Sequence, residues 1–142
     1  MILPDANLLL YAVNTDSPDH RAAFGWWQSL LESDAAIGLY TGVVFAFVRL
    51  STNRRVFSQP LSVEAAFAYL QNWLAHPGVT LVDAETEDLL VAQRLLAVAG
   101  TGGNLVSDAQ IAAAALRLKA NIHSADRDFD RFPKIDWHNP LN

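Results

Sequence analysis

Cysteine is absent from this sequence of 142 residues. Its absence excludes disulfides, thiolate zinc sites and cysteine nucleophiles, so any bound metal must be held by oxygen or imidazole ligands. The four histidines show no HxxxH spacing or other close pair, which argues against a zinc hydrolase. A phosphate-binding loop is missing as well, because the glycine-rich stretch 100–103 lacks the lysine that such a loop requires.

No apolar run is long enough to span a membrane. The longest, residues 35–48, is interrupted by Gly38 and Gly42 and falls short of the roughly 20 residues that a spanning helix needs. The first residues, Met-Ile-Leu-Pro-Asp, show no basic segment followed by an apolar run and a cleavage site, so no secretory signal is visible. We therefore expect a cytoplasmic protein without a membrane segment.

Net positive charge is lacking too. Ten Lys and Arg against fifteen Asp and Glu give a net charge of −5, the wrong sign for a protein that binds nucleic acid with its whole surface. Any contact with nucleic acid must therefore be local. The basic residues form two groups, which are equally well explained as solvated surface charge: Arg49, Arg54 and Arg55, and then Arg117, Lys119, Arg127, Arg131 and Lys134.

Apolar residues are abundant and arranged in short runs. They make up 51% of the chain, against 18% charged residues, which is enough to fill the core of a single domain spanning residues 1–142. The runs predict strands at Met1–Leu3, Ala35–Tyr40, Val79–Val82 and Asn121–Ser124. Because helical patterns separate these strands, crossover connections must join them, which predicts an α/β fold with a mostly parallel sheet and helices on both faces.

Helical periodicity marks the segments between the predicted strands. Ser17 and Pro18 fit an N-cap followed by proline at the first helical position, and apolar residues recur at helical spacing from 22 to 31. Thr41–Thr52 is a second candidate helix, although its Val-Val-Phe start would also suit a strand. Ser62 opens a third helix.

Two more helices are predicted in the C-terminal half. Asp83 begins one whose first turn is acidic, and Gly100–Gly103 ends it. Ser107-x-x-Gln110 is a capping-box pattern, so Asp108 should lie in the first turn of an alanine-rich helix.

Three aspartates fall where an open parallel sheet binds its ligands. Asp5 directly follows the first predicted strand, Asp126 follows the last, and Asp108 opens a helix. Since ligands bind at the carboxyl ends of such strands, the three carboxylates can meet in one cleft. A group of like charges needs a cation, and carboxylate oxygens suit Mg²⁺ or Mn²⁺, which would activate water for phosphodiester hydrolysis. Each aspartate taken alone is more typical of a cap or turn.

Four blocks of the sequence together resemble one family. They are Met1–Leu10 (MILPDANLLL), Val43–Phe57 with its Phe-Val-Arg-Leu segment, Gly103–Ala113 (GNLVSDAQIAA) and Ser124–Pro133 (SADRDFDRFP). In this order they resemble the VapC-type PIN-domain toxins. The resemblance implies a PIN-like α/β/α sandwich and an Mg²⁺- or Mn²⁺-dependent endoribonuclease, the toxin of a type II toxin–antitoxin system. It also implies an RNA substrate, a VapB-like antitoxin and a homodimer.

The resemblance assigns roles to single residues. Asp5 and Asp108 match the main metal ligands and Asp126 matches a further acid that holds metal or water, so these three are expected to be catalytic. Asp128 matches a second aspartate of the closing motif and is a fourth candidate ligand, although its position before Phe129 equally suits a cap.

Other residues of the motifs are candidates for supporting roles. Ser107 and Ser124 match residues that support the carboxylates. Arg49 and Arg127 are candidates for contact with an RNA phosphate, and pairing of Arg49 with a nearby carboxylate is an equal alternative.

The chain departs from the family at Ala46. Most such toxins carry a glutamate there, and no Asp or Glu occurs between Asp34 and Glu64. Loss of this acid weakens a second metal position more than the first, because Mg²⁺ readily keeps water in place of protein oxygens. A catalytically weakened PIN-fold module that binds RNA or protein is therefore the alternative. A phosphatase is disfavoured, since its Asp-x-Asp pair is replaced by Asp5-x-Asn7.

Overall fold

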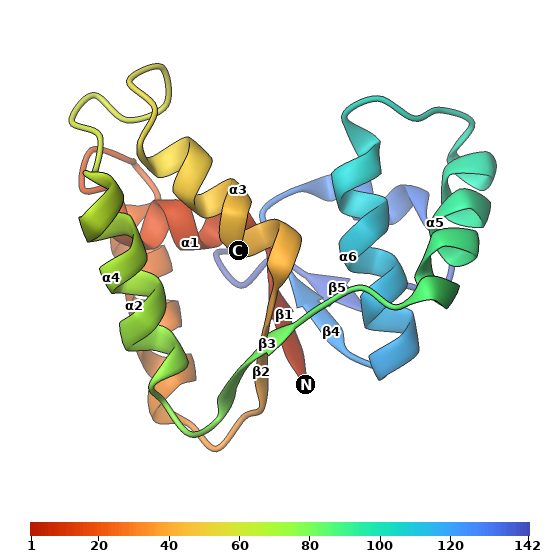
Figure 1. Cartoon of the computed structure of the whole chain (residues 1–142), viewed down its shortest axis with the longest axis horizontal. Coiled ribbons are helices and arrows are strands. Elements are labelled where there is room, and N and C mark those ends of the chain that lie inside the picture. The colour runs from red at the N-terminus through yellow and green to blue at the C-terminus, as the bar shows by residue number, and fades with distance from the viewer.

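Five parallel strands form one sheet in the computed structural model, which describes residues 1–142 (Figure 1). The strands are β1 (Ile2–Pro4), β2 (Ile37–Tyr40), β3 (Val79–Val82), β4 (Asn121–His123) and β5 (Trp137–His138). Their order across the sheet is β3-β2-β1-β4-β5. Ile2 of β1 pairs with Ile37 on one side and with Asn121 on the other. β1 is therefore the central strand. The chain adds β2 and β3 on one side of it and then β4 and β5 on the other side.

Six α-helices cover the two faces of the sheet: α1 (Ala6–Val13), α2 (His20–Glu32), α3 (Thr41–Ser51), α4 (Val63–Leu74), α5 (Thr86–Ala99) and α6 (Leu105–Leu118). Figure 1 shows α1 to α4 on one side of the sheet and α5 and α6 on the other. This is the α/β/α sandwich that the sequence predicts, with a sheet that is parallel throughout. None of the helices combines the length and the apolar composition needed to cross a membrane.

The core lies where the helices meet the two faces of the sheet. All four residues of β2 are buried, since helices cover both of its faces. α6 buries Ala112–Ala115 in consecutive positions, and these small side chains let the helix lie close to both α5 and the sheet. Trp27 of α2 and Trp73 of α4 are also buried and meet edge to face, with ring centroids 5.4 Å apart. The helices are thus fixed to the sheet and to one another.

Two predicted helix starts are wrong, by two residues in α2 and by three residues in α5. α2 begins at His20, because Ser17 and Pro18 belong to the turn before it. α5 begins at Thr86 rather than at Asp83, which lies in the connection from β3. In both connections the polar side chain accepts a hydrogen bond from a nearby turn N–H, which competes with its use as a helix cap.

The capping box predicted at Ser107-x-x-Gln110 is wrong as well. α6 begins at Leu105, and the Ser107 hydroxyl donates to the carbonyl of Asn104, 3.3 Å away, inside the first turn. Asp108 nevertheless lies in the first turn of α6, as the sequence predicts.

Two other predicted helices are confirmed. Thr41–Thr52 corresponds to α3, and the alternative of a strand there is wrong. The hydroxyl of Thr41 donates to the carbonyl of Val82 at 3.1 Å, where β2 gives way to the helix. Ser62 caps α4, since its hydroxyl accepts a hydrogen bond from the N–H of Ala65 at 3.1 Å.

Helix α1 and strand β5 are absent from the predicted elements. The sequence of α1 is Ala-Asn-Leu-Leu-Leu-Tyr-Ala-Val. This apolar run lacks the spacing of three and four residues between apolar and polar positions that identifies a helix. Its start is fixed by Asp5, whose carboxylate accepts a hydrogen bond from the N–H of Ala6 at 2.8 Å. β5 has only two residues and lies at the edge of the sheet. The strand predicted at Asn121–Ser124 ends one residue earlier, so Ser124 lies just beyond β4.

Gly38 should not tolerate a side chain. It lies inside β2, where a Cβ would come within 2.6 Å of Leu3 and 2.7 Å of Val82. We expect Gly38→Ala to lower the free energy of unfolding by about 1–3 kcal/mol, because the neighbouring side chains must move. Denaturant titration followed by circular dichroism measures this change.

Gly25→Ala is the matched control, since nothing lies within 4 Å of the added Cβ. This substitution in α2 should leave the free energy of unfolding unchanged or raise it by up to about 1 kcal/mol. Equal effects of the two substitutions would contradict the close packing around β2.

Candidate metal centre

The carboxyl ends of β1 and β4 lie side by side at the centre of the sheet. The N–H of Asp5 donates to the carbonyl of His123 at 2.9 Å, so the pairing of these strands continues one residue beyond β1. This bond brings Asp5 beside Ser124, the first residue after β4. The chain leaves β1 toward one side of the sheet and returns on its other side, and open α/β sheets bind ligands at such a switch point.

Three hydrogen bonds fix the carboxylate of Asp5. Its Oδ1 accepts from the N–H of Ala6 at 2.8 Å. Its Oδ2 accepts from the hydroxyl of Ser124 at 2.7 Å and from the amide of Asn7 at 3.3 Å. Ser124 is fully buried, so its hydroxyl is a fixed support for Asp5.

Asn7 joins the two strand ends through hydrogen bonds, a role that the sequence alone does not predict. Its amide nitrogen donates to the hydroxyl of Ser124 at 3.2 Å, and its carbonyl accepts from the N–H of Ala125 at 3.2 Å. The same hydroxyl of Ser124 accepts from the N–H of Asp126 at 3.0 Å. The sequence feature that could have identified Asn7 is its position. It lies two residues after Asp5, which caps α1, and therefore at the same end of the sheet.

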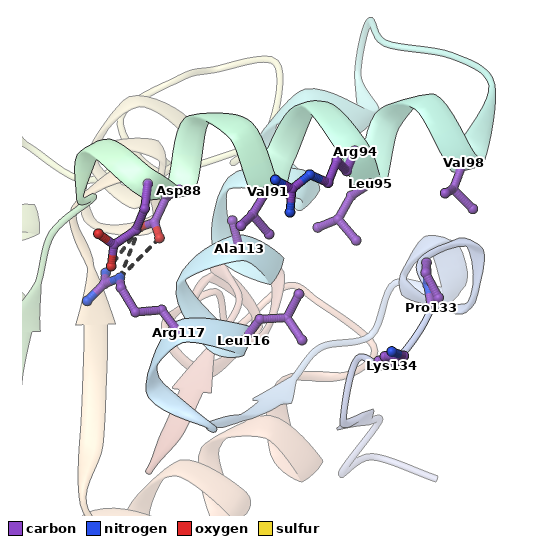
Figure 2. A pocket seen from close by; sticks show the side chains of 11 residues that line it. Asp88, Val91, Arg94, Leu95, Val98, Ala113, Leu116, Arg117, Pro133 and Lys134 are labelled. Atoms are coloured by element: carbon purple, nitrogen blue, oxygen red, sulfur yellow. Dashed lines mark hydrogen bonds and ion pairs between the residues drawn. The ribbon is translucent and has the colours of Figure 1, made fainter.

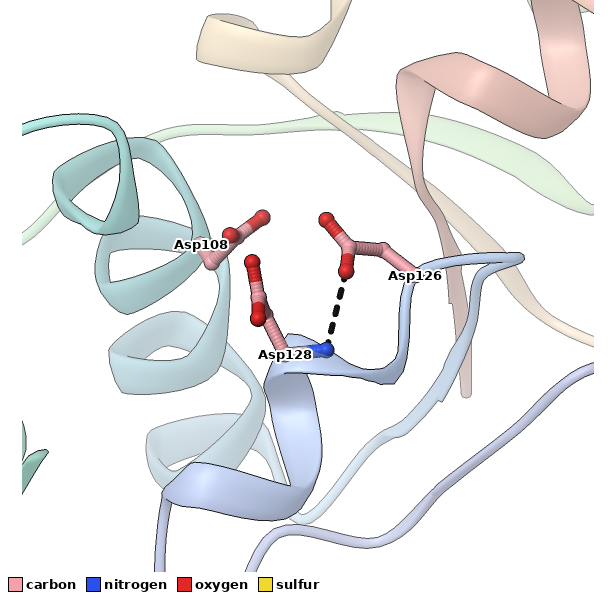
Figure 3. A group of neighbouring side chains, drawn as sticks. All are labelled: Asp108, Asp126 and Asp128. Atoms are coloured by element: carbon pink, nitrogen blue, oxygen red, sulfur yellow. Dashed lines mark hydrogen bonds between the residues drawn. The ribbon is translucent and has the colours of Figure 1, made fainter.

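Three carboxylates, which we name the carboxylate cluster, meet next to this network. One oxygen each of Asp108, Asp126 and Asp128 lies within 4.8 Å of the others (Figure 3). Asp108 comes from α6, and the other two come from the turn and the 3₁₀ helix Arg127–Arg131 that follow β4. Asp126 caps the 3₁₀ helix by accepting from the N–H of Asp128 at 2.8 Å, so the alternative that Asp128 is the cap is wrong.

Asp5 lies outside this close group but borders the same hollow as Asp108. The hollow has a volume of about 150 Å³ and is lined by, among others, Asp5, Ala46, Arg49, Ser107 and Asp108. Ala46 thus faces the site and leaves it without an acid from α3. Arg49 reaches the hollow from the same helix, whereas Arg127 is exposed and does not line it.

Burial and mutual repulsion raise the pKa of two of these carboxyl groups. Burial raises the pKa of Asp5. The hydrogen bond from Ser124 lowers this pKa by a smaller amount, and the charge of Asp126 raises it further. The pKa of Asp108 rises from its usual 3.8 to about 7 through burial and then through the charges of the three neighbouring aspartates. No Lys or Arg forms an ion pair with any of them, since the one salt bridge of the protein lies elsewhere.

The donor set fits a divalent cation of the Mg²⁺ or Mn²⁺ type. The ligand atoms that meet here are carboxylate oxygens, which such hard cations prefer. A doubly charged ion would also remove the repulsion that helps to raise the pKa of Asp108. With Ala46 in α3 the protein supplies fewer oxygens than an octahedral ion needs, and Mg²⁺ readily keeps water at the remaining positions.

Two histidines also come together near the end of β4. The rings of His123 and His138 have centroids 4.3 Å apart, a proximity that their spacing in the sequence hides. Burial and then the charge of His138 lower the pKa of His123 to about 4, and its Nδ1 accepts a hydrogen bond from the indole N–H of Trp26 at 3.1 Å. His123 is therefore a neutral, internally bonded side chain that packs β4 against α2.

A larger cavity, of about 520 Å³, lies between α5, α6 and Pro133–Lys134 (Figure 2). None of the aspartates of the carboxylate cluster lines it, and apolar side chains such as Val91 and Leu116 form much of its wall. At one end, the buried Asp88 accepts a hydrogen bond from the guanidinium of Arg117 at 3.0 Å. This pair joins α5 to α6, and neither of its residues belongs to the carboxylate cluster.

Comparison with known proteins gives one consistent family. The PIN domain family model matches residues 2–135. Ribonuclease VapC33 of Mycobacterium tuberculosis is 44% identical over 141 residues, which cover 99% of both chains. VapC20 of Mycobacterium tuberculosis, a sarcin–ricin loop cleaving toxin, superposes with a TM-score of 0.71 at 17% identity, over 96% of this chain and 99% of that one. VapBC2 from Rickettsia felis, bound to a promoter DNA fragment, gives a TM-score of 0.71 at 19% identity over 98% of each chain.

Asp108 should weaken the metal-free fold at neutral pH. Its pKa of about 7 lies above the usual 3.8, so between these values the folded chain keeps a proton that the unfolded chain has lost. The stability from this group is therefore fully present below its unfolded pKa and is lost as the pH rises through the folded pKa. We expect Asp108→Asn in EDTA to raise the melting temperature by a few degrees above neutral pH and to change it little in acid.

Asp34→Asn is the control for this pH series, because Asp34 is exposed and lies outside the site. Its melting temperature should follow that of the wild type at every pH. If Asp108→Asn also followed the wild type across the series, the carboxylates would not repel one another as described.

Proposed function

Since the chain belongs to the PIN-domain family, and within it to the VapC type, we propose that it is a divalent-metal-dependent endoribonuclease and the toxin of a type II toxin–antitoxin pair. The observation that carries this proposal is the close approach of the carboxylate cluster to Asp5 at the central strand ends. Likeness over the full length to a named ribonuclease supports it. Residues 1–142 act in this proposal as a single catalytic domain.

The carboxylate cluster would hold the cation, with Asp5 at its border. When bound, Mg²⁺ or Mn²⁺ lowers the pKa of a coordinated water and neutralises charge on the scissile phosphate. Ser124 and Asn7 hold the carboxylate of Asp5 through bonds of 2.7 and 3.3 Å, and such supports behind metal ligands set their orientation. No nucleophilic side chain is then required, because water attacks the phosphodiester.

The remaining site residues would bind the substrate or support the metal ligands. Asp108 would bind the cation, whose charge lowers the pKa that this carboxyl group has without metal. Arg49 lines the hollow beside Asp5 and would bind a phosphate oxygen of the RNA, while Ser107 would support the adjacent Asp108. Arg127 is exposed in the 3₁₀ helix and would contact the RNA backbone outside the hollow.

Partners follow from membership of the VapC type. A structural relative, VapBC2 of Rickettsia felis, is named for a VapB together with a VapC, and its structure is bound to a DNA fragment from their promoter. We therefore propose a VapB-like antitoxin as the protein partner of this chain. The same proposal includes a homodimer and action in the cytoplasm, where the RNA substrate is found.

Ala46 is the observation that favours a second candidate, a PIN-fold module that binds RNA or protein without cutting it. An alanine at this place in the hollow supplies no acid from α3. The three clustered carboxylates and Asp5 still provide the oxygens that one hydrated ion needs. The nuclease is therefore the better supported of the two.

Purified protein, freed of any antitoxin, should cut total cellular RNA into discrete fragments with Mg²⁺ or Mn²⁺ and not with EDTA. Asp108→Asn should lower the rate by more than about 100-fold, because even groups that only support metal ligands are worth about 10- to 100-fold. Gel electrophoresis of the products over time measures the rate.

Asp34→Asn serves as the charge-matched control and should cut at the wild-type rate, since it lies outside the site. Cleavage that is unchanged in Asp108→Asn would reject the assignment of the cluster. Folded wild-type protein that binds RNA and never cuts it would replace the nuclease by the binding module.

Ala46→Glu should tighten Mg²⁺ binding by about tenfold, because affinity rises with the number of charged ligands around the ion. The new carboxylate would enter the hollow that Asp5 and Asp108 line. Isothermal titration calorimetry gives the dissociation constant. Ala46→Gln is the control of equal size without charge, and equal affinities of the two variants would mean that position 46 does not reach the ion.

A further inference from the structure

Helix α1 has one face that the core does not cover. Five of its eight residues are buried and apolar. Asn7, Tyr11 and Asn14 are only half-buried, and their spacing of four and then three residues places them on one side of the helix axis. Asn7 also bonds to Asp5 and Ser124, so this stripe starts at the metal centre and leads away from it.

The stripe forms one wall of a second hollow, of about 470 Å³, which we name the Tyr11 pocket. Its other walls are the connection from α1 to α2, with Asp16–Pro18, and the connection from α3 to α4, with Val56–Ser58. Apolar and polar groups both line it, and its volume is within the range of about 300–1,000 Å³ found for small-ligand sites. A nucleotide base, which has an apolar face and polar edges, matches such a lining.

The walls of the Tyr11 pocket are fixed to each other. Figure 1 shows the connection from α3 to α4 beside the connection from α1 to α2. Phe57 is buried and anchors the first, and the hydroxyl of Ser58 donates to the carboxylate of Asp16 in the second at 2.5 Å. Arg54 and Arg55 lie exposed on the same connection, and neither forms an ion pair in the protein.

Tyr11 also lies within electrostatic reach of the metal centre. Burial raises the pKa of its phenol, and the charges of Asp19, then Asp126, then Asp5 raise it further. Two of these aspartates belong to the site where the scissile phosphate would bind. Tyr11 lies four residues after Asn7 on the same side of α1, so a base stacked on its ring would belong to a nucleotide near that phosphate.

We propose that the Tyr11 pocket binds one base of the RNA strand next to the scissile phosphate, with the base stacked on the ring of Tyr11. This inference rests on the proposed ribonuclease function. An aromatic ring stacks on any base, and the amide nitrogen of Asn14 offers a donor to the base edge, while its Oδ1 accepts from the N–H of Asp16 at 3.2 Å. Arg54 and Arg55, which are exposed and directly precede Val56 of the pocket wall, would bind phosphates next to the bound nucleotide.

The test measures RNA binding separately from cleavage. The probes are fluorescent oligoribonucleotides of each single base and a ribose-phosphate oligomer without bases, and anisotropy gives the affinities. All variants carry Asp108→Asn, so that no probe is cut. Tyr11→Ala should weaken binding of at least one base-bearing probe about tenfold, whereas Tyr11→Phe, which keeps the ring, should bind as its parent does. Binding of the baseless probe should not change.

Tyr69→Ala is the matched control, because Tyr69 is a partly exposed tyrosine of α4 outside the pocket. It should leave all affinities unchanged. Circular dichroism checks folding, and Tyr11→Leu, which keeps apolar bulk without a ring, repeats the test if Tyr11→Ala unfolds.

The outcomes separate this inference from the function on which it rests. If wild-type protein cuts RNA and Tyr11→Ala binds every probe as its parent does, the base pocket is overturned and the ribonuclease stands. Equal weakening for the baseless probe also overturns it, because the pocket would then bind only the backbone. If Tyr11→Ala weakens binding of a base-bearing probe but the wild-type protein never cuts RNA, the base pocket is supported and the ribonuclease function is contradicted.

Discussion

Repulsion among carboxylates at one edge of the sheet is the constraint on which the rest of this structure depends. The parallel pairing of β1 with β4 places Asp5 beside the segment that carries Asp126, and α6 adds Asp108 from the other layer. Bringing these charges together out of water is unfavourable, as the pKa of about 7 for Asp108 records. A divalent ion reverses the sign of this interaction, so a site that is unfavourable without metal becomes a strong cation site with it.

The supports of the site explain why the fold tolerates that repulsion. The hydroxyl of Ser124 donates to Asp5 and accepts from the N–H of Asp126, so one buried side chain holds both strand ends. Asn7 closes the network from α1. The same helix turns Tyr11 toward the second hollow, so a single eight-residue helix links the cation site to the proposed base pocket. In this proposal, α1 would couple the hydrogen bonds at the strand ends to recognition of the substrate.

The sequence predicts the parts of this arrangement that depend on local patterns. Short apolar runs between helical segments identify β2 and β3, and motif order identifies Asp5, Asp108 and Asp126. Contacts between distant residues are not visible in one sequence: the bond from Ser124 to Asp5 spans 119 residues. Helix α1 is not predicted because its apolar run lacks a helical period. The starts of α2 and α5 are misplaced because Ser17 and Asp83 accept hydrogen bonds within turns, and the start of α6 is misplaced because Ser107 lies inside the first turn and donates to Asn104. Asp128 shows the same ambiguity, which the cap made by Asp126 resolves.

The central claim is that these aspartates form one cation site, and locating the ion tests it most directly. Crystals grown with Mn²⁺ allow the ion to be placed by its anomalous scattering, without reference to any activity. The account predicts one strong peak bordered by Asp108, Asp126 and Asp128, and loss of that peak in Asp108→Asn. Ordered crystals at saturating Mn²⁺ with no peak among these carboxylates, or with the peak elsewhere in the chain, would contradict it.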